Sequence, residues 1–147
     1  MIGIKVARIE EVRKHPNADK LYIEKIDLGG EKRQIVSGLA GHYEPEELQG
    51  KNILVVYNLK PANLRGERSE GMLLAVSKED EIAIVEAPDL KPGDKIKFEE
   101  DVNDEGEITI QEFFNHKLEV KNGKLYIDGN SSTKNLKTDK GIEGKVE

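Results

Sequence analysis

Short apolar segments separated by turn residues recur along the first 100 residues of this chain. Apolar and polar residues alternate in several of them, as in strands that bury one face. One segment instead holds a continuous apolar run from Ile53 to Tyr57, which predicts a strand buried on both faces. The predicted strands are Ile4–Val12, Lys20–Leu28, Gln34–Ser37, Asn52–Tyr57, Met72–Val76, Ile82–Val85 and Lys95–Phe98.

One short helix is expected over Tyr43–Gln49. Pro45 suits its first turn, nearby glutamates suit its positive end, and Gly50 suits its stop. Many short strands with a single small helix predict an all-β fold, either a small barrel or a sandwich. The pattern by itself does not choose between the two.

The chain changes character after residue 100. An acidic, glycine-containing stretch at Asp101–Glu107 indicates a linker or exposed loop. Asn122-Gly123 then lies between alternating apolar residues, which predicts a β-hairpin over residues 117–128 with a type I′ turn. Such a hairpin is marginal alone, so the barrel or a second copy of the chain must cover it. The predicted register places Val120 opposite Leu125, Leu118 opposite Ile127 and Lys117 opposite Asp128.

These patterns divide the chain into a domain over residues 1–100 and a C-terminal extension over residues 101–147. The end of the extension, from Ser131 to Glu147, is polar and rich in lysine and glycine. Polar termini of this kind are often mobile in part. Leu136, Ile142 and Val146 are the apolar residues with which this polar tail could dock.

The charge balance restricts the partners of the protein. The chain carries 23 Lys and Arg against 29 Asp and Glu, a net charge of −6, whereas a generic nucleic-acid binder is basic. Any affinity for RNA must therefore come from a local positive face and must depend steeply on salt. No apolar run approaches the ~20 residues of a membrane span, and no signal peptide is evident, so we expect a cytoplasmic protein without membrane contact.

The sequence holds no recognisable catalytic apparatus. Dinucleotide and phosphate loops, a nucleophile elbow and the His-Glu-x-x-His motif are all absent. Cysteine is also absent, which excludes disulfides, thiolate metal sites and cysteine nucleophiles. The three histidines have no ligand-like spacing. We therefore expect no enzymatic activity, no cofactor and no metal site.

Three motifs lie between Arg13 and Met72: His15–Leu21, then Arg33–Leu39, then Asn58–Gly66 continuing to Ser69–Met72. In this order, with short strands between them, they resemble the tRNA-binding domain family. That family includes domains appended to methionyl-tRNA synthetases, free-standing tRNA-binding proteins and endothelial-monocyte-activating-polypeptide-like domains. The resemblance covers roughly residues 4–99.

The resemblance implies a five-stranded OB-fold barrel with the short helix at one end. Some family members carry a C-terminal extension that packs on the barrel and mimics the dimer interface of shorter relatives. The extension of this chain is similar in length and in its apolar hairpin. We therefore expect either a monomer, in which the extension replaces a partner, or a homodimer, and we favour the monomer.

The first motif, from His15 to Asp19, is interpreted as a structural turn, in which Asn17 or Asp19 caps the local backbone. In the second motif, Arg33 and Ser37 stand four residues apart on one strand and share a face. The resemblance implies that this strand borders the RNA, whereas spacing alone is equally consistent with a surface arginine and an edge serine.

The segment Asn58–Met72 is the best candidate for RNA contact. It combines cations and neutral hydrogen-bonding groups that can reach phosphates, riboses or bases with glycines that permit close approach. Met72 has two interpretations, an adaptable platform for a base or a core methionine. The resemblance implies RNA-contacting or site-shaping roles for Asn58, Lys60, Arg65, Ser69 and Met72.

The leading hypothesis is a non-catalytic module that binds the folded L shape of tRNA. It would assist an aminoacyl-tRNA synthetase, with methionyl-tRNA synthetase as the expected partner, in cis or in trans. Two alternatives remain open. One is an export-related, chaperone-like dimer that binds unfolded polypeptides, and the other is a docking module of a multi-synthetase complex.

Overall fold

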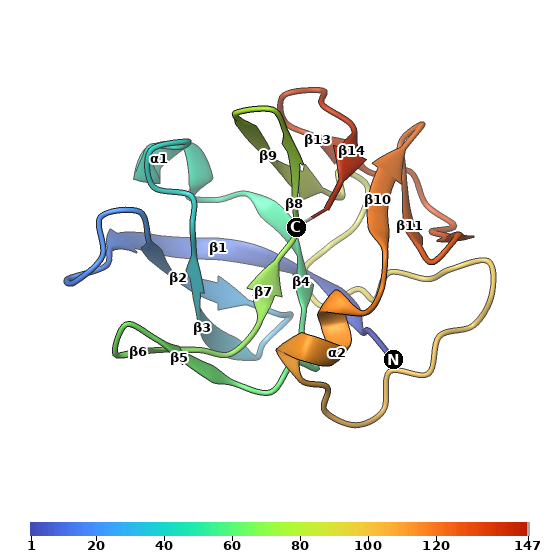
Figure 1. Cartoon of the computed structure of the whole chain (residues 1–147), viewed down its shortest axis with the longest axis horizontal. Helices are drawn as coiled ribbons and strands as arrows, with labels where there is room; N and C mark the ends of the chain where they lie inside the picture. The colour runs from blue at the N-terminus through green and yellow to red at the C-terminus, as the bar shows by residue number, and fades with distance from the viewer. Residues whose placement is uncertain (147) are drawn as a thin grey trace.

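The computed structural model describes residues 1–146, and antiparallel strands dominate it. A meander of three strands, β1 (Ile4–Lys14), β2 (Tyr22–Asp27) and β3 (Lys32–Ser37), forms one half of a barrel. β4 (Asn52–Val56) pairs with the other edge of β1, and shorter strands continue the sheet beyond it. Figure 1 shows the meander at the left of the molecule and the C-terminal extension at the right.

The remaining elements are short. They are β5 (Ala62–Leu64), β6 (Glu67–Ser69), β7 (Met72–Leu73), β8 (Ala75–Lys78), β9 (Glu81–Glu86), α2 (Ile110–Phe114), β10 (Leu118–Lys121), β11 (Lys124–Ile127), β12 (Asn130–Ser131), β13 (Lys137–Thr138) and β14 (Gly144–Lys145). Both β7 and β9 pair with β4, and β8 forms a hairpin with β9. The all-β, barrel-like class is confirmed. Within residues 1–146 the main sheet has eight strands, because several short strands follow β4 and β13 adds an edge.

The two faces of β4 contribute apolar side chains to two different hydrophobic clusters. Ile53 and Val55 belong to the cluster inside the barrel, whereas Leu54 and Val56 belong to the cluster beneath the C-terminal extension. All four side chains are fully buried. The prediction of a strand buried on both faces is confirmed, and the extension is the reason for it.

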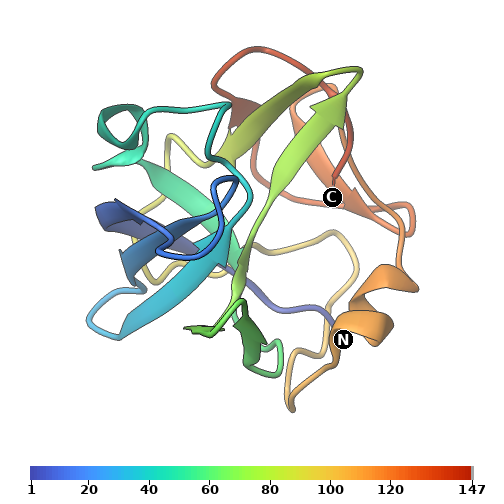
Figure 2. The ribbon, with the colours of Figure 1, turned by 60° about the vertical axis from the view of Figure 1, so that its left-hand side comes forward.

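The predicted hairpin of the extension is present as β10 and β11. Its register is the expected one, and Asn122 and Gly123 form the turn with φ of 54° and 75°. Both values suit a type I′ turn. The apolar side chains of the hairpin join the cluster that holds Leu54 and Val56, so the hairpin packs on the barrel as predicted. Figures 1 and 2 both show the extension, in orange to red, along one side of the barrel.

The two helices are short and capped. The predicted helix is present as α1 (Pro45–Leu48), where Glu44 and Glu47 form a capping box. The second helix, α2, was not expected, so the prediction of a single helix was wrong. Thr109 and Glu112 form its capping box, a Thr-x-x-Glu pattern that is visible in the sequence.

The prediction of a strand over Lys95–Phe98 was wrong. This segment makes only isolated bridges, Lys95 with Lys5 of β1 and Phe98 with Ser132 of the extension. It passes from the barrel to the extension, so its two ends pair with different partners and no continuous ladder forms. The predicted strand Met72–Val76 is likewise divided, into β7 and β8.

The polar tail carries two of the short strands. β13 pairs with β9 of the barrel, and β14 pairs with β10. Leu136 and Val146 are buried in the cluster beneath the extension, and Ile142 packs against it. Glu147, the last residue of the expected extension, lies outside the described residues. Within residues 1–146, neither helix has the length and apolar character that crossing a membrane requires.

Candidate nucleic-acid interface

The β1–β2 connection, residues 15–21, is fastened to the β5–β6 hairpin, residues 62–69, by a buried histidine. His15 Nδ1 accepts a hydrogen bond of 3.0 Å from the Asn17 amide. The ring hydrogen is therefore on Nε2, which donates to the Leu64 carbonyl oxygen at 2.9 Å. The predicted structural turn is confirmed, although His15 supplies the side-chain hydrogen bonds. This turn also holds the hairpin beside the connection.

The β5–β6 hairpin was not predicted from the sequence. Arg65 and Gly66 form its two-residue turn with φ of 56° and 93°, and Leu64 pairs with Glu67. Positive φ at both positions is typical of a type I′ turn. A Cβ atom on Gly66 would meet nothing within 4 Å, so this glycine serves the turn conformation. Its role in the close approach of the backbone to a ligand stays a prediction.

Exposed cations lie along the β1–β2 connection and the β5–β6 hairpin. Lys60 precedes β5, Arg65 lies at the hairpin turn, and Arg68 lies on β6. Within residues 1–146, neither Lys60 nor Arg65 forms an ion pair, and Arg68 meets Glu70 only at 3.8 Å. These charges are therefore available to phosphate groups. The cationic ridge, as we call this surface, consists of Lys14, Lys20, Lys60, Arg65 and Arg68, all of them exposed.

Arg33 is mainly engaged inside the protein. Its Nη1 donates hydrogen bonds to the carbonyl oxygens of Tyr57 at 2.6 Å and Glu70 at 3.1 Å, and its Nε donates to Glu31 at 2.7 Å. Only 20% of the side chain is exposed. Arg33 therefore fixes the start of the loop after β4 against the root of the hairpin.

Asn58 has a comparable anchoring position. Its Oδ1 accepts a hydrogen bond from the Gly3 amide at 2.9 Å, and its Nδ2 donates to the carbonyl oxygen of Met1 at 2.6 Å. Longer bonds of 3.3 Å reach the carbonyl oxygens of Asp104 and Gly106. Asn58 thus joins the end of β4 to the N-terminus and to the linker before α2.

Ser69 is buried at the root of the hairpin. Its Oγ accepts a hydrogen bond from the Val36 amide of β3 and donates one to the Gly71 carbonyl oxygen, each at 3.0 Å. A Cβ atom on Gly71 would lie 3.0 Å from a methyl group of Val55, so this glycine permits close packing against β4. Ser69 therefore holds the hairpin onto β3.

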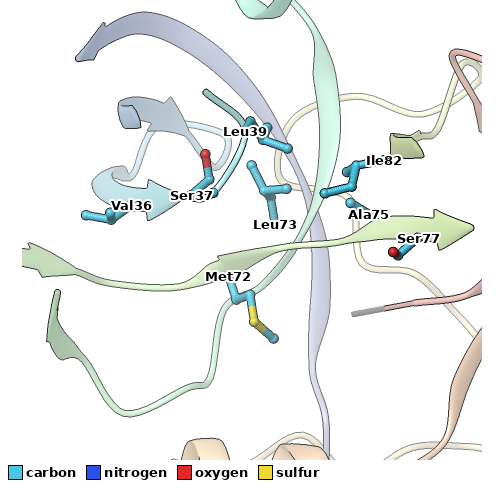
Figure 3. A pocket seen from close by; sticks show the side chains of 9 residues that line it. Val36, Ser37, Leu39, Met72, Leu73, Ala75, Ser77 and Ile82 are labelled. Atoms are coloured by element: carbon cyan, nitrogen blue, oxygen red, sulfur yellow. The ribbon is translucent and has the colours of Figure 1, made fainter. Parts of the chain in front are cut away.

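Ser37 and Met72 both line a pocket of about 240 Å³ between the end of β3 and the β7–β8 segment. Met72 is half-buried there and packs against the cluster beneath the extension. Behind Ser37 lies Glu24, a fully buried carboxyl group that shares a hydrogen bond of 2.5 Å with the Ser37 hydroxyl. Burial raises the pKa of Glu24 to about 8. The nine residues that line the pocket, shown in Figure 3, are Val36, Ser37, Gly38, Leu39, Met72, Leu73, Ala75, Ser77 and Ile82.

The structure thus divides the predicted RNA-contacting residues. Lys60 and Arg65 are exposed on the cationic ridge, whereas Ser37 and Ser69 are buried and hydrogen-bonded internally. Sequence reasoning counted Arg68 among the cations of the segment Asn58–Met72 but not among the predicted contact residues, and it did not identify the tie through His15 or Glu24. A buried glutamate carries no signal in the sequence, because the strand pattern does not reveal which polar side chain faces inward.

Comparisons with known proteins identify the family of this chain. The model of the family described as "Putative tRNA binding domain" matches residues 4–95, more than half of the chain. The methionine–tRNA ligase of Borrelia recurrentis is 41% identical over 138 residues, which is 87% of this chain and 19% of that protein. The chain spans less than a fifth of the length of the curated methionine–tRNA ligases that it matches.

Two solved structures share the fold. The C-terminal domain of Plasmodium vivax p43 has a TM-score of 0.79 and 36% identity, and the match covers 99% of this chain and 92% of that domain. The CsaA chaperone protein from Picrophilus torridus has a TM-score of 0.61 and 30% identity, with 65% of this chain and 91% of that chain covered. The likeness to p43 thus includes the extension. By these matches the chain belongs to the tRNA-binding domain family.

Proposed function

We propose that this chain is a non-catalytic tRNA-binding module. It recognises the folded L shape of tRNA through backbone contacts and shape, and it assists an aminoacyl-tRNA synthetase in the cytoplasm. Methionyl-tRNA synthetase is the proposed partner, because the curated relatives that match are methionine–tRNA ligases. In those proteins the matching region is a small part of a longer chain, so the same module suits action in cis or in trans.

The cationic ridge is the observation that carries this proposal. The free charges of Lys60 and Arg65 occur on a chain whose net charge is −6, so the positive potential is local. The hydrogen bond from His15 to the Leu64 carbonyl oxygen fixes the β1–β2 connection against the β5–β6 hairpin in the absence of a ligand. A preformed set of cations fits the phosphate backbone of a folded RNA and carries no sequence information by itself.

The tyrosines of the barrel favour phosphate contact over stacking. Tyr22 and Tyr43 are buried, and their hydroxyl groups donate to the Tyr43 carbonyl oxygen and to Asp139. Tyr57 donates its hydroxyl hydrogen to Asp104, and Lys5 lies 4.4 Å from the centre of its ring. None of these three rings offers the free face that binds single-stranded bases in many OB folds.

Modest affinity is sufficient for this role. A module attached to a synthetase, or bound to one, raises the local concentration of tRNA at the catalytic domain. We propose that the protein is a monomer, because the extension covers the outer face of β4 within one chain. The face that Leu54 and Val56 would otherwise expose is thereby occupied.

A chaperone-like function is the second candidate, and the likeness to CsaA from Picrophilus torridus supports it. The apolar lining of the pocket beside Met72 is compatible with binding a side chain of an unfolded polypeptide. The two functions differ in their electrostatics. Binding through phosphates weakens steeply with salt, whereas binding through apolar side chains holds or strengthens.

Titration of the full chain with total tRNA and with an unfolded peptide, each at two salt concentrations, separates these candidates. The tRNA-binding proposal expects saturable tRNA binding that falls by at least tenfold between about 50 and 200 mM salt, as several phosphate contacts imply. Salt-insensitive peptide binding without measurable tRNA binding would overturn the proposal in favour of the chaperone-like function.

A further inference from the structure

The pocket beside Met72 is a gap in the barrel wall next to the cationic ridge. Within residues 1–146, β3 pairs with β2 and has no ladder with β7 or β8, so the wall stays open between Ser37 and Ala75. The root of the hairpin borders this gap, because Ser69 is hydrogen-bonded to Val36 of the pocket lining. Figure 3 shows the Leu73 side chain pointing toward Leu39 on one side of the β7–β8 segment, whereas the Met72 side chain lies on its other side.

The walls of the pocket are mostly apolar, but its lining includes two serines, Ser37 and Ser77. Ser37 is only 8% exposed and rests on Glu24, which is not exposed at all. Glu24 Oε2 is bonded to Ser37, and Glu24 Oε1 has no hydrogen-bond partner among the described residues. Buried polar groups without partners are rare in native proteins and call for a physical explanation.

The protonation state of Glu24 decides whether Ser37 can donate a hydrogen bond to a ligand. Because burial raises the pKa of Glu24 to about 8, its carboxyl group carries a proton at neutral pH. A proton on Oε1 would be an unpaired donor, whereas a proton on Oε2 can be donated to Ser37 Oγ. The hydroxyl hydrogen of Ser37 is then free to turn toward the pocket and to donate to an acceptor there.

We propose that this pocket receives one unstacked nucleobase of the bound tRNA, and that Ser37 donates a hydrogen bond to an acceptor on the edge of that base. The proposal rests on tRNA binding by the cationic ridge and adds a single base to its phosphate contacts. Glu24 is a positioning residue, which orients the Ser37 hydroxyl and does not touch the RNA.

Three properties of the pocket favour a base as the occupant. A nucleobase combines two apolar faces with a polar edge, and the pocket combines mostly apolar walls with two serines, Ser37 and Ser77. A volume of about 240 Å³ lies below the range of pockets for drug-sized ligands, so it suits one ring system. Met72 supplies a polarizable thioether that packs well against aromatic rings.

The methionine methyl groups provide a direct test, because the chain has only two methionines. Met72 lines the pocket, whereas Met1 is 54% exposed and takes no part in it. In the full chain labelled with ¹³C at the methionine methyl groups, addition of total tRNA should move the Met72 signal through the ring current of the base. The Met1 signal, as the internal control, should remain in place.

Two variants test the same site by affinity. Ala75→Leu fills the pocket, and Ser37→Ala removes its donor, while Ser131→Ala on the extension is the matched control for loss of a hydroxyl. Each pocket variant should weaken tRNA binding about tenfold, within the range for loss of one base contact on a protein surface. The dependence of affinity on salt should stay unchanged, because no phosphate contact is lost.

The outcomes separate the pocket from the proposed function. A stationary Met72 signal, with tRNA binding of the variants equal to that of the wild type, refutes the base pocket and leaves tRNA binding intact. A Met72 signal that moves with an unfolded peptide and not with tRNA assigns the pocket to peptides and also refutes it. No tRNA binding by the wild type removes the proposed function and this inference together. If Ala75→Leu unfolds, the Met72 signal of the wild type still decides.

Discussion

Replacement of Glu24 by glutamine should make the protein more stable at alkaline pH. Glu24 is fully buried, with one oxygen bonded to Ser37 at 2.5 Å and the other without a partner within residues 1–146. A carboxylate in this position would be a buried charge with no cation beside it in that part of the chain, which is strongly unfavourable. Glutamine has nearly the same shape, keeps a hydrogen bond to Ser37 and never ionises.

The magnitude follows from the pKa of Glu24, which burial raises from the ordinary value of 4.5 to about 8. Between these two pH values the native chain holds a proton that the unfolded chain has released, so stability falls as pH rises. The loss is about 1.4 kcal/mol for each pH unit, and about 4 to 5 kcal/mol over the whole interval. Above pH 8 both states are ionised, and the loss remains constant.

Urea unfolding of the wild type and of Glu24→Gln at pH 5 and pH 9 measures this effect. The two proteins should have nearly equal unfolding free energies at pH 5, and the variant should be several kcal/mol more stable at pH 9. The comparison cancels the titration of other groups, because both chains share them. A difference between the two proteins that is the same at pH 5 and pH 9 would refute the assignment of a neutral, buried Glu24.

Three further predictions concern the hairpin and the extension. Ser69→Ala leaves the Val36 amide unpaired and should lower the unfolding free energy by about 1 to 3 kcal/mol in urea, with weaker tRNA binding and an unchanged salt slope. His15→Ala removes the tie to the hairpin; we expect faster hydrogen exchange at its amides, and equal exchange rates would contradict this. Truncation of the chain after Glu100 exposes the outer face of β4, so light scattering should show a dimer for the truncated chain and a monomer for the full chain. A monomer in both cases would contradict the replacement of a partner by the extension.

Elements defined by local chemistry were predictable from the sequence. Asn122-Gly123 specifies a turn with positive φ at both positions, and the alternation around it specifies the register of β10 and β11. The apolar run of β4 likewise requires cover on both faces. By contrast, the β5–β6 hairpin has no apolar alternation, since all residues of Ala62–Leu64 are exposed, and its turn, the His15 tie and the bond of Ser69 to β3 define it.

The candidate site was less predictable because residue type does not reveal orientation. Ser69 and Lys60 belong to the same polar segment, yet the barrel wall buries the first and leaves the second exposed. Arg33 has the chemistry of a phosphate ligand, but the nearby carbonyl oxygens of Tyr57 and Glu70 occupy its guanidinium group. Such positions depend on how distant strands close the barrel, which the local sequence does not encode.

The salt dependence of tRNA binding by ridge variants tests the central claim most directly. Equilibrium binding of total tRNA to the full chain should be compared for the wild type, Lys60→Ala, Arg65→Ala and, as the control, Lys121→Ala on the extension. The plot of log affinity against log salt should lose about one unit of slope in each ridge variant, one for each lost phosphate contact, and none in the control. Identical slopes and affinities in all four proteins would contradict the assignment of the cationic ridge as the surface that holds tRNA.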